Sequence, residues 1–208
     1  MFDIDGTLIE SCGFDSDCYF EAVKYVTGFE LNTDWALYKN ITDSGILDEF
    51  LKMKGLREER ELLHKQVREK FTQLISKHLK KNPVCEVDGA IDFLKQLQLK
   101  NDVEIAIATG GWGDTAKAKL NSAGFNISGV AFASSLDHFE RTNVMKMAES
   151  RCNNQSFVSK TYFGDGSWDK KASEELSYNF VLVGNKLQYS KQVESFRDSH
   201  SVLSLIGI

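Results

Sequence analysis

The sequence lacks the features that would indicate a zinc-bound, disulfide-rich or nucleic-acid-binding protein. Its 208 residues contain four cysteines with no Cys-x-x-Cys pair, which argues against a structural zinc site and a dense disulfide framework. Lys and Arg total 25 against 30 Asp and Glu, giving a formal net charge of −5. With no surplus of positive charge to neutralise a phosphate backbone, we expect no nucleic-acid partner.

The sequence is equally poor in targeting signals. No run approaches the roughly 18 apolar residues that a membrane helix requires, and the acidic N-terminus lacks the basic and apolar regions of a signal peptide. We therefore expect a cytoplasmic protein with reduced thiols and no membrane partner. Nothing in the composition indicates the oligomeric state.

The length and a hydrophobic fraction of 42% suit one α/β core with a modest insertion. In the second half of the chain short apolar strands alternate with amphipathic helices. Uninterrupted apolar runs separated by helices predict a parallel sheet buried on both faces, which is a doubly wound, Rossmann-like α/β fold. The strands are expected at 103–108, 130–133, 161–163 and 180–183, and the helices at 115–123, 143–150 and 170–176.

Between residues 10 and 82 the strand signal vanishes and helical periodicity replaces it. The only proline, Pro83, would stop the last helix of this stretch. We predict an α/β core at 1–11 and 83–208, interrupted by an all-helical domain at 12–82. Two apolar helix faces are expected there, formed by Tyr19, Ala22, Val23 and Val26 and by Leu63, Val67, Phe71, Leu74 and Ile75.

The opening run Asp3-Ile4-Asp5-Gly6-Thr7 predicts a strand that ends in a sharp turn at Gly6. Two acids one residue apart at a strand's end point to the same side. One carboxylate can attack phosphorus while the other protonates the leaving oxygen and later activates water. The alternative is a plain turn, since Asp-Gly is a common turn signal.

Three further polar signals fall at predicted strand ends, and the carboxyl edge of an open α/β sheet is where ligands bind. Thr109-Gly110-Gly111 can cradle phosphoryl oxygens, and Arg141 is the best basic candidate, with Lys146 as its fallback. Asp165 and Asp169 add oxygen ligands of the kind that Mg²⁺ prefers. Acids around an anionic phosphate require a metal ion and a basic side chain.

A competing interpretation concerns the loop that begins at Gly111. Gly111-Trp112-Gly113-Asp114-Thr115-Ala116 matches a loose dinucleotide fingerprint, with Asp137 roughly twenty residues further on. A dinucleotide site would leave Asp3, Asp5, Asp165 and Asp169 without a purpose.

The motifs Asp3-Ile4-Asp5-Gly6-Thr7-Leu8, Ile107-Ala108-Thr109-Gly110-Gly111, Arg141 and Gly164-Asp165-Gly166-Ser167-Trp168-Asp169 resemble the four ordered motifs of the haloacid dehalogenase superfamily. The helical insertion resembles that superfamily's class I cap, as in the phosphoglycolate phosphatase and β-phosphoglucomutase group. The stretch 40–46 also resembles cap sequence of that group. The resemblance spans nearly the whole chain.

This resemblance implies a role for each motif residue. Asp3 would form an aspartyl-phosphate and ligate Mg²⁺, and Asp5 would act as acid and then base while lending its carbonyl to the metal. Asp165 would ligate the metal directly, and Asp169 directly or through water. Thr109, with Gly110 and Gly111, would bind the phosphoryl group, and Arg141 would neutralise its charge.

Two departures from the family pattern stand out. The third motif is usually lysine, so Arg141 keeps the charge but changes its reach and geometry. The first strand has only two residues before Asp3, fewer than the usual five or six. We expect either a start further upstream or an α-amino group unusually close to the site.

The leading hypothesis is a Mg²⁺-dependent phosphatase of a small phosphorylated metabolite, with the helical insertion as a cap that excludes water and selects the substrate. The alternatives are a phosphomutase, a phospho-accepting receiver and a binding protein on a degenerate scaffold. A receiver has no use for a cap of about 70 residues.

Overall fold

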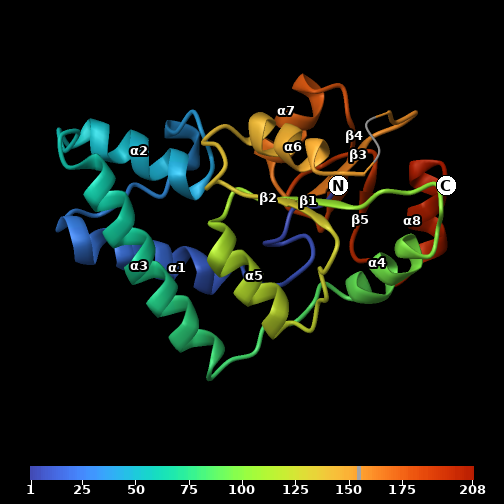
Figure 1. Ribbon diagram of the computed structural model, residues 1–208, viewed down its shortest axis with the longest axis horizontal. Helices are drawn as coiled ribbons and strands as arrows, with labels where there is room; N and C mark the ends of the chain where they lie inside the picture. The colour runs from blue at the N-terminus through green and yellow to red at the C-terminus, as the bar shows by residue number, and fades with distance from the viewer. Residues whose placement is uncertain (154–155) are drawn as a thin grey trace.

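The computed structural model describes residues 1–153 and 156–208 and contains an α/β core with a helical segment beside it (Figure 1). In the described part of the chain, no helix is both long and apolar enough to cross a membrane. The helices are α1 (Cys12–Thr27), the short 3₁₀ helix η1 (Trp35–Leu37), α2 (Asp43–Met53), α3 (Arg60–Leu79), α4 (Ala90–Gln98), α5 (Gly113–Ser122), α6 (Arg141–Ser150), α7 (Ser167–Glu175) and α8 (Ser199–Ile206). The strands are β1 (Ala106–Ala108), β2 (Ala131–Ala133), β3 (Thr161–Gly164), β4 (Asn179–Val183) and β5 (Gln192–Val193).

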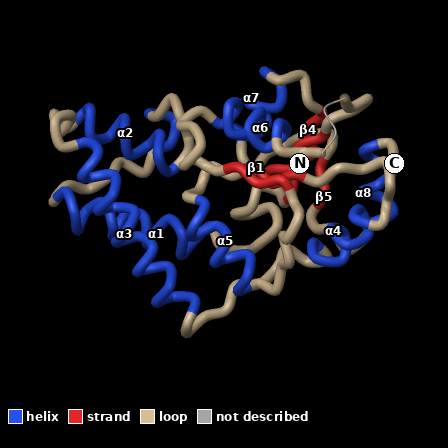
Figure 2. The backbone as a smooth tube through the Cα atoms, in the orientation of Figure 1, coloured by secondary structure: helices blue, strands red, loops and turns tan. Residues whose placement is uncertain are grey.

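The strands form one parallel sheet at the centre of the core (Figure 2). Strand β1 pairs with β2, and β4 lies between β3 and β5. Phe2 bridges the two halves through parallel pairing with Ile107 and Phe163. The order across the sheet is therefore β2, β1, the opening segment, β3, β4 and β5, which confirms the predicted parallel sheet.

The opening segment is short but is held on both sides by the sheet. On the β1 side, the Phe2 amide donates to Ala106 O and the Ala108 amide donates to Phe2 O, each at 2.9 Å. On the β3 side, the Asp3 amide donates to Phe163 O, also at 2.9 Å. These bonds fix the backbone that carries Asp3.

The α-amino group lies away from the predicted site. It donates to Thr161 O at 2.8 Å, and Thr161 begins β3 whereas Asp165 follows its end. The expectation of an α-amino group close to the site is therefore wrong.

Helices cover both faces of the sheet because successive strand residues point to opposite sides. Ile107, Phe163 and Val181 pack with α4, α5 and α8 in one cluster. Their neighbours Tyr162 and Leu182 pack with α6 and α7 in another. Figure 1 shows the two helix layers above and below the strands. The doubly wound fold expected from the apolar runs is confirmed.

The helical segment α1 to α3 has an apolar cluster of its own. The predicted faces are buried there, including Tyr19 and Val23 on α1 and Val67 and Phe71 on α3. Helix α3 ends at Leu79, before Pro83, as expected. The domain division at residues 12 and 82 stays a prediction.

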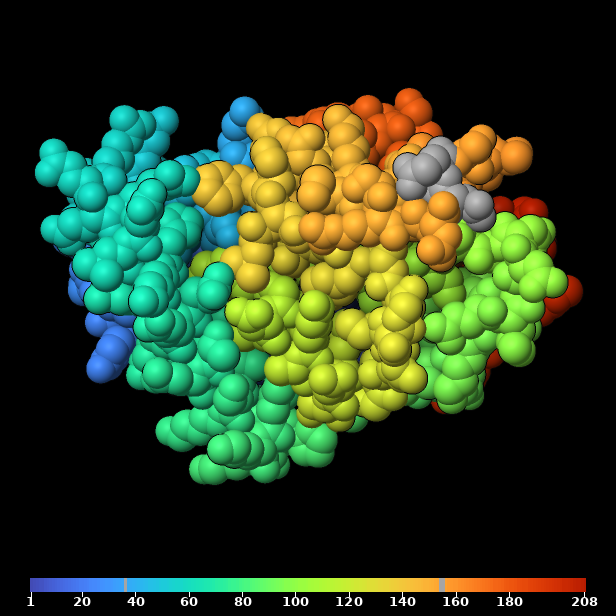
Figure 3. Space-filling model, in the orientation of Figure 1, coloured from blue at the N-terminus to red at the C-terminus, as the bar shows by residue number. Residues whose placement is uncertain are grey.

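A side chain of the core completes this cluster. Trp112, which directly precedes α5, is 1% exposed and packs among the residues of the helical segment. Its ring centroid lies 5.5 Å from that of Phe71, and its Nε1–H donates to Ser44 Oγ at 2.8 Å. Figure 3 shows the two parts pressed against one another. Trp112 therefore ties the helical segment to the core.

We predict that Trp112→Ala lowers the free energy of unfolding by about 3–5 kcal/mol, the usual result of deleting a buried aromatic ring. Urea denaturation measures the change. Leu99, which is 84% exposed, provides the control, since Leu99→Ala should change stability by no more than about 0.5 kcal/mol. Equal stabilities for the two variants would contradict the packing described for Trp112.

Candidate active site

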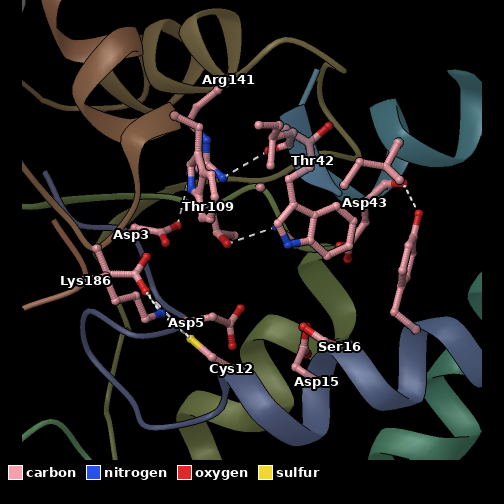
Figure 4. A pocket seen from close by; sticks show the side chains of 18 residues that line it. Asp3, Asp5, Cys12, Asp15, Ser16, Thr42, Asp43, Thr109, Arg141 and Lys186 are labelled. Carbon is pink, nitrogen blue, oxygen red and sulfur yellow. Dashed lines mark hydrogen bonds and ion pairs between the residues drawn. The ribbon is translucent and has the colours of Figure 1, made fainter. Parts of the chain in front are cut away.

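The carboxyl edge of the sheet carries a cavity of about 200 Å³ between the core and the helical segment (Figure 4). Asp3 and Asp5 reach it from the opening segment, and Thr109 reaches it from the end of β1. Arg141 enters from the first turn of α6, and Asp165 follows β3. Residues that are far apart in the sequence converge here because parallel strands end at one edge.

Three buried carboxylates form a candidate metal site. One oxygen from each of Asp3, Asp165 and Asp169 lies within 4.8 Å of the others, and the side chains are buried. Oxygen donors at this spacing suit Mg²⁺, whose shell is usually completed by waters and phosphate oxygens. The residues present therefore fit the predicted ion.

Asp169 also caps the first turn of α7. It lies in the first turn of α7, where its Oδ2 accepts the Gly166 amide at 3.0 Å. Its Oδ1 accepts from Arg141 Nη1 at 2.8 Å. Helix capping and membership of the acidic cluster are thus combined in one carboxylate.

The guanidinium of Arg141 lies among these acids. Nη1 is 2.8 Å from Asp169 Oδ1 and 3.4 Å from Asp3 Oδ1, and Nη2 donates to Ile41 O at 3.2 Å. Burial lowers the pKa of Arg141, but Asp169 and Asp3 outweigh it and leave the pKa raised. Lys146, the fallback, is exposed on α6 and does not line the cavity.

Glycines permit the close approaches in the site. A β-carbon on Gly110 would lie 2.3 Å from Arg141 Nη2, and one on Gly6 would lie 2.1 Å from Asp165 Oδ2. Gly6 also has a φ of +79°, which disfavours other residues. Beside them Thr109 is buried, and its Oγ1 accepts the Gly111 amide at 3.1 Å. This places a hydroxyl and the backbone of a glycine-containing loop directly at the cavity.

Burial of the acids is electrostatically unfavourable. It raises the pKa of Asp3 well above its usual range, and the neighbouring Asp169 adds to the shift. Burial also raises the pKa of Asp169 to about 6, although Arg141 opposes this. A bound cation would stabilise both carboxylates in their charged form.

A buried lysine that was not predicted from the sequence contacts Asp5. Lys119, on α5, is 1% exposed, and its Nζ lies 2.5 Å from Asp5 Oδ1 and 2.5 Å from Asp15 Oδ1. The Ser11 hydroxyl donates to the same Asp5 oxygen. Lys119 lies with Thr115 and Ala116 on the buried face of α5. A lysine on the buried face of a predicted helix is the sequence signal that could have revealed it.

A second unpredicted lysine, Lys186, follows β4. It forms an ion pair with Asp165, and its Nζ lies 3.3 Å from Cys12 Sγ. Burial and the adjacent Asp165 raise the pKa of Cys12 to about 11, so this thiol stays protonated at neutral pH. Lys186 therefore places a positive charge among the residues that line the cavity.

The structure does not support the dinucleotide interpretation. Between the two glycines of its fingerprint, Trp112 turns into the helical segment. Asp137 is exposed, pairs with Arg151 at 2.6 Å and accepts the Ser134 amide. It belongs to a surface loop and not to this cavity.

We predict that Lys119→Met lowers the free energy of unfolding by about 3–5 kcal/mol, because two carboxylates lose their buried partner. Urea denaturation is the measurement. Adding Asp15→Asn should recover part of the loss by removing one unpaired charge.

The matched control is Lys95→Met, since the Lys95 side chain is 67% exposed and its ion pair contributes little. If the Lys119 variant were no less stable than the Lys95 variant, the buried ion pairs would not have the importance assigned to them.

Comparisons with known proteins agree with this arrangement. The fold and site define a Rossmann-like α/β protein with a cluster of carboxylates at the carboxyl edge of its parallel sheet. The family model of the haloacid dehalogenase-like hydrolases matches residues 1–174, and the chain belongs to that family. A search of curated protein sequences finds no match.

Solved structures share the fold at low sequence identity. A hydrolase from Pseudomonas syringae has a TM-score of 0.75 and 20% identity, covering 99% of this chain and 97% of its own. CbbY from Rhodobacter sphaeroides, solved with phosphate, has a TM-score of 0.72 and 13% identity over 100% and 97%. A β-phosphoglucomutase from Clostridium difficile has a TM-score of 0.70 and 17% identity over 99% and 95%.

Proposed function

We propose that the protein is a Mg²⁺-dependent phosphatase that hydrolyses a small phosphorylated metabolite through an aspartyl-phosphate on Asp3. The observation that carries the proposal is the convergence of Asp3, Asp165 and Asp169 within 4.8 Å, beside Arg141 and Thr109. Membership of the hydrolase family and a phosphate complex of a structural neighbour support it. A site that only binds a neutral ligand would not need buried charged side chains of this kind, because burying them is costly.

In the first step a carboxylate oxygen of Asp3 attacks phosphorus while the ester P–O bond breaks. The leaving oxygen takes a proton from Asp5. Ser11 and Lys119 both contact Oδ1 of Asp5, so Oδ2 is the oxygen available for proton transfer. Arg141 and the loop at Thr109 hold the phosphoryl oxygens.

In the second step Asp5 takes a proton from water, and the water oxygen attacks phosphorus. The bond between Asp3 and phosphorus breaks, which restores the carboxylate and releases phosphate. Asp3, Asp165, Asp169 and the carbonyl of Asp5 would hold Mg²⁺, which supplies neutralisation of the charge on the phosphoryl group when bound.

The helical segment, residues 12–82, is proposed to act as a cap. It contributes one wall of the cavity, including Asp15, Tyr19 and Asp43. Excluding water there would protect the aspartyl-phosphate until the leaving group has departed. A phospho-accepting receiver would not need this wall.

We predict that Asp3→Asn lowers the hydrolysis of an aryl phosphate by at least about a thousandfold, because the amide cannot act as the nucleophile. Phosphate release is measured with and without Mg²⁺, and removal of Mg²⁺ should likewise abolish it. Asp92→Asn, on the exposed face of α4, is the control and should be unaffected.

Equal rates for wild type and Asp3→Asn would exclude this mechanism. Isomerisation of a sugar phosphate without phosphate release would instead favour a phosphomutase. Binding of phosphate esters with no turnover would favour a degenerate binding scaffold.

We also predict that Mg²⁺ raises the thermal midpoint of unfolding. At a hundredfold excess over its Kd the ion stabilises the folded state by about 2.7 kcal/mol, or about 5–10 °C for a chain of this size. Differential scanning calorimetry measures the shift. Asp169→Asn should lose most of it and Asp92→Asn none, whereas identical shifts in both variants would contradict the assigned metal site.

A further inference from the structure

The two walls of the cavity differ in charge. The core supplies Arg141 and Lys186, and each of them is already paired with a core carboxylate. Among the described residues that line the cavity, the helical segment supplies neither Lys, Arg nor His. It supplies the carboxylates Asp15 and Asp43 and the rings of Tyr19 and Trp35. The wall facing the substrate's leaving group is therefore acidic and aromatic.

A bound phosphate ester does not remove this surplus of negative charge. The two charges of Mg²⁺ and those of a phosphate dianion cancel each other. Of the two carboxylates of the helical segment, Asp15 is paired with Lys119, whereas Asp43 makes no ion pair among the described residues. Burial, with the nearby Asp15, raises the pKa of Asp43 to about 8, so a cationic group on the part of the substrate beyond the phosphate would stabilise the charged form of Asp43. A second phosphate or a carboxylate on that part would meet like charges, which is unfavourable.

Asp43 lies next to the position of the leaving group. A β-carbon on Gly111 would lie 3.6 Å from Asp5 Oδ2 and 3.7 Å from Asp43 Oδ2, so the proposed acid and Asp43 both border the loop at Gly111. The Trp112 amide donates to Asp43 Oδ2 at 2.8 Å, and the Asp43 amide donates to Gly110 O at 2.8 Å. These bonds hold the carboxylate in place over the loop at Thr109.

We propose that Asp43 selects the substrate, and that the substrate is a phosphate monoester whose alcohol portion carries an ammonium group close to the ester oxygen. The Asp43 carboxylate accepts from the ammonium, while Tyr19 and Trp35 provide aromatic surface that favours a cation. This inference rests on the proposed phosphatase function and narrows its substrate class to esters of amino alcohols and amino sugars.

The test uses three esters with leaving groups of similar size: 2-aminoethyl phosphate, propyl phosphate and carboxymethyl phosphate. In the wild type, kcat/KM should fall in that order. In Asp43→Asn, which can still accept the Trp112 amide, the ratio of kcat/KM for the aminoethyl to the propyl ester should fall about 10- to 100-fold, as for the loss of a charged hydrogen bond.

Asp48→Asn is the matched control, because it makes the same change on the same helix outside the cavity and should leave this ratio unaltered. A wild-type preference for the propyl or carboxymethyl ester would overturn the proposal without any variant. An unchanged ratio in a folded Asp43→Asn would also overturn it. Hydrolysis of the esters that still depends on Asp3 would show that only the specificity, and not the phosphatase mechanism, had failed.

Discussion

The structure depends on neutralising carboxylates that are buried at one edge of a sheet. Asp3, Asp165 and Asp169 cannot lie within 4.8 Å of each other in a medium of low dielectric without nearby positive charge. Two cations from separate elements meet this requirement, Arg141 of α6 and Lys186 after β4. A third, Lys119 of α5, pairs with the nearby acids Asp5 and Asp15. The packing of these elements therefore also sets the charge of the site.

Much of the fold follows from the sequence because buried parallel strands and amphipathic helices leave clear patterns. The expected strand at 161–163 is β3, and the expected helix at 143–150 lies within α6. The strand expected at 103–108 is shortened to Ala106–Ala108. Strand β5 has two residues, too few for any periodicity, and α4 and α8 were not anticipated. The short opening strand gains its rigidity from hydrogen bonds to both neighbours, which no local pattern reveals.

The predicted site residues share one property, since each stands at a strand end or begins the following helix. Asp3, Thr109 and Asp165 could be found for that reason, and topology alone brings them together. Lys186 and Asp43 could not, because their positions depend on packing between distant segments, and for Lys119 the sequence offers only its place on the buried face of α5. Lys119 lies 114 residues from Asp5. Asp43 reaches the cavity because contacts of Trp112 and Thr42 hold the helical segment against the core.

The central claim is that Asp3 carries the phosphoryl group during turnover. Asp5→Asn should still accept phosphate from an aryl ester, whose leaving group needs little protonation, but should release it slowly because no base activates water. Peptide mass spectrometry after acid quenching of that variant measures the outcome. The account predicts one phosphoryl group on the peptide that contains Asp3. An unmodified Asp3 in an enzyme that turns over, or a phosphoryl group on another residue, would contradict it.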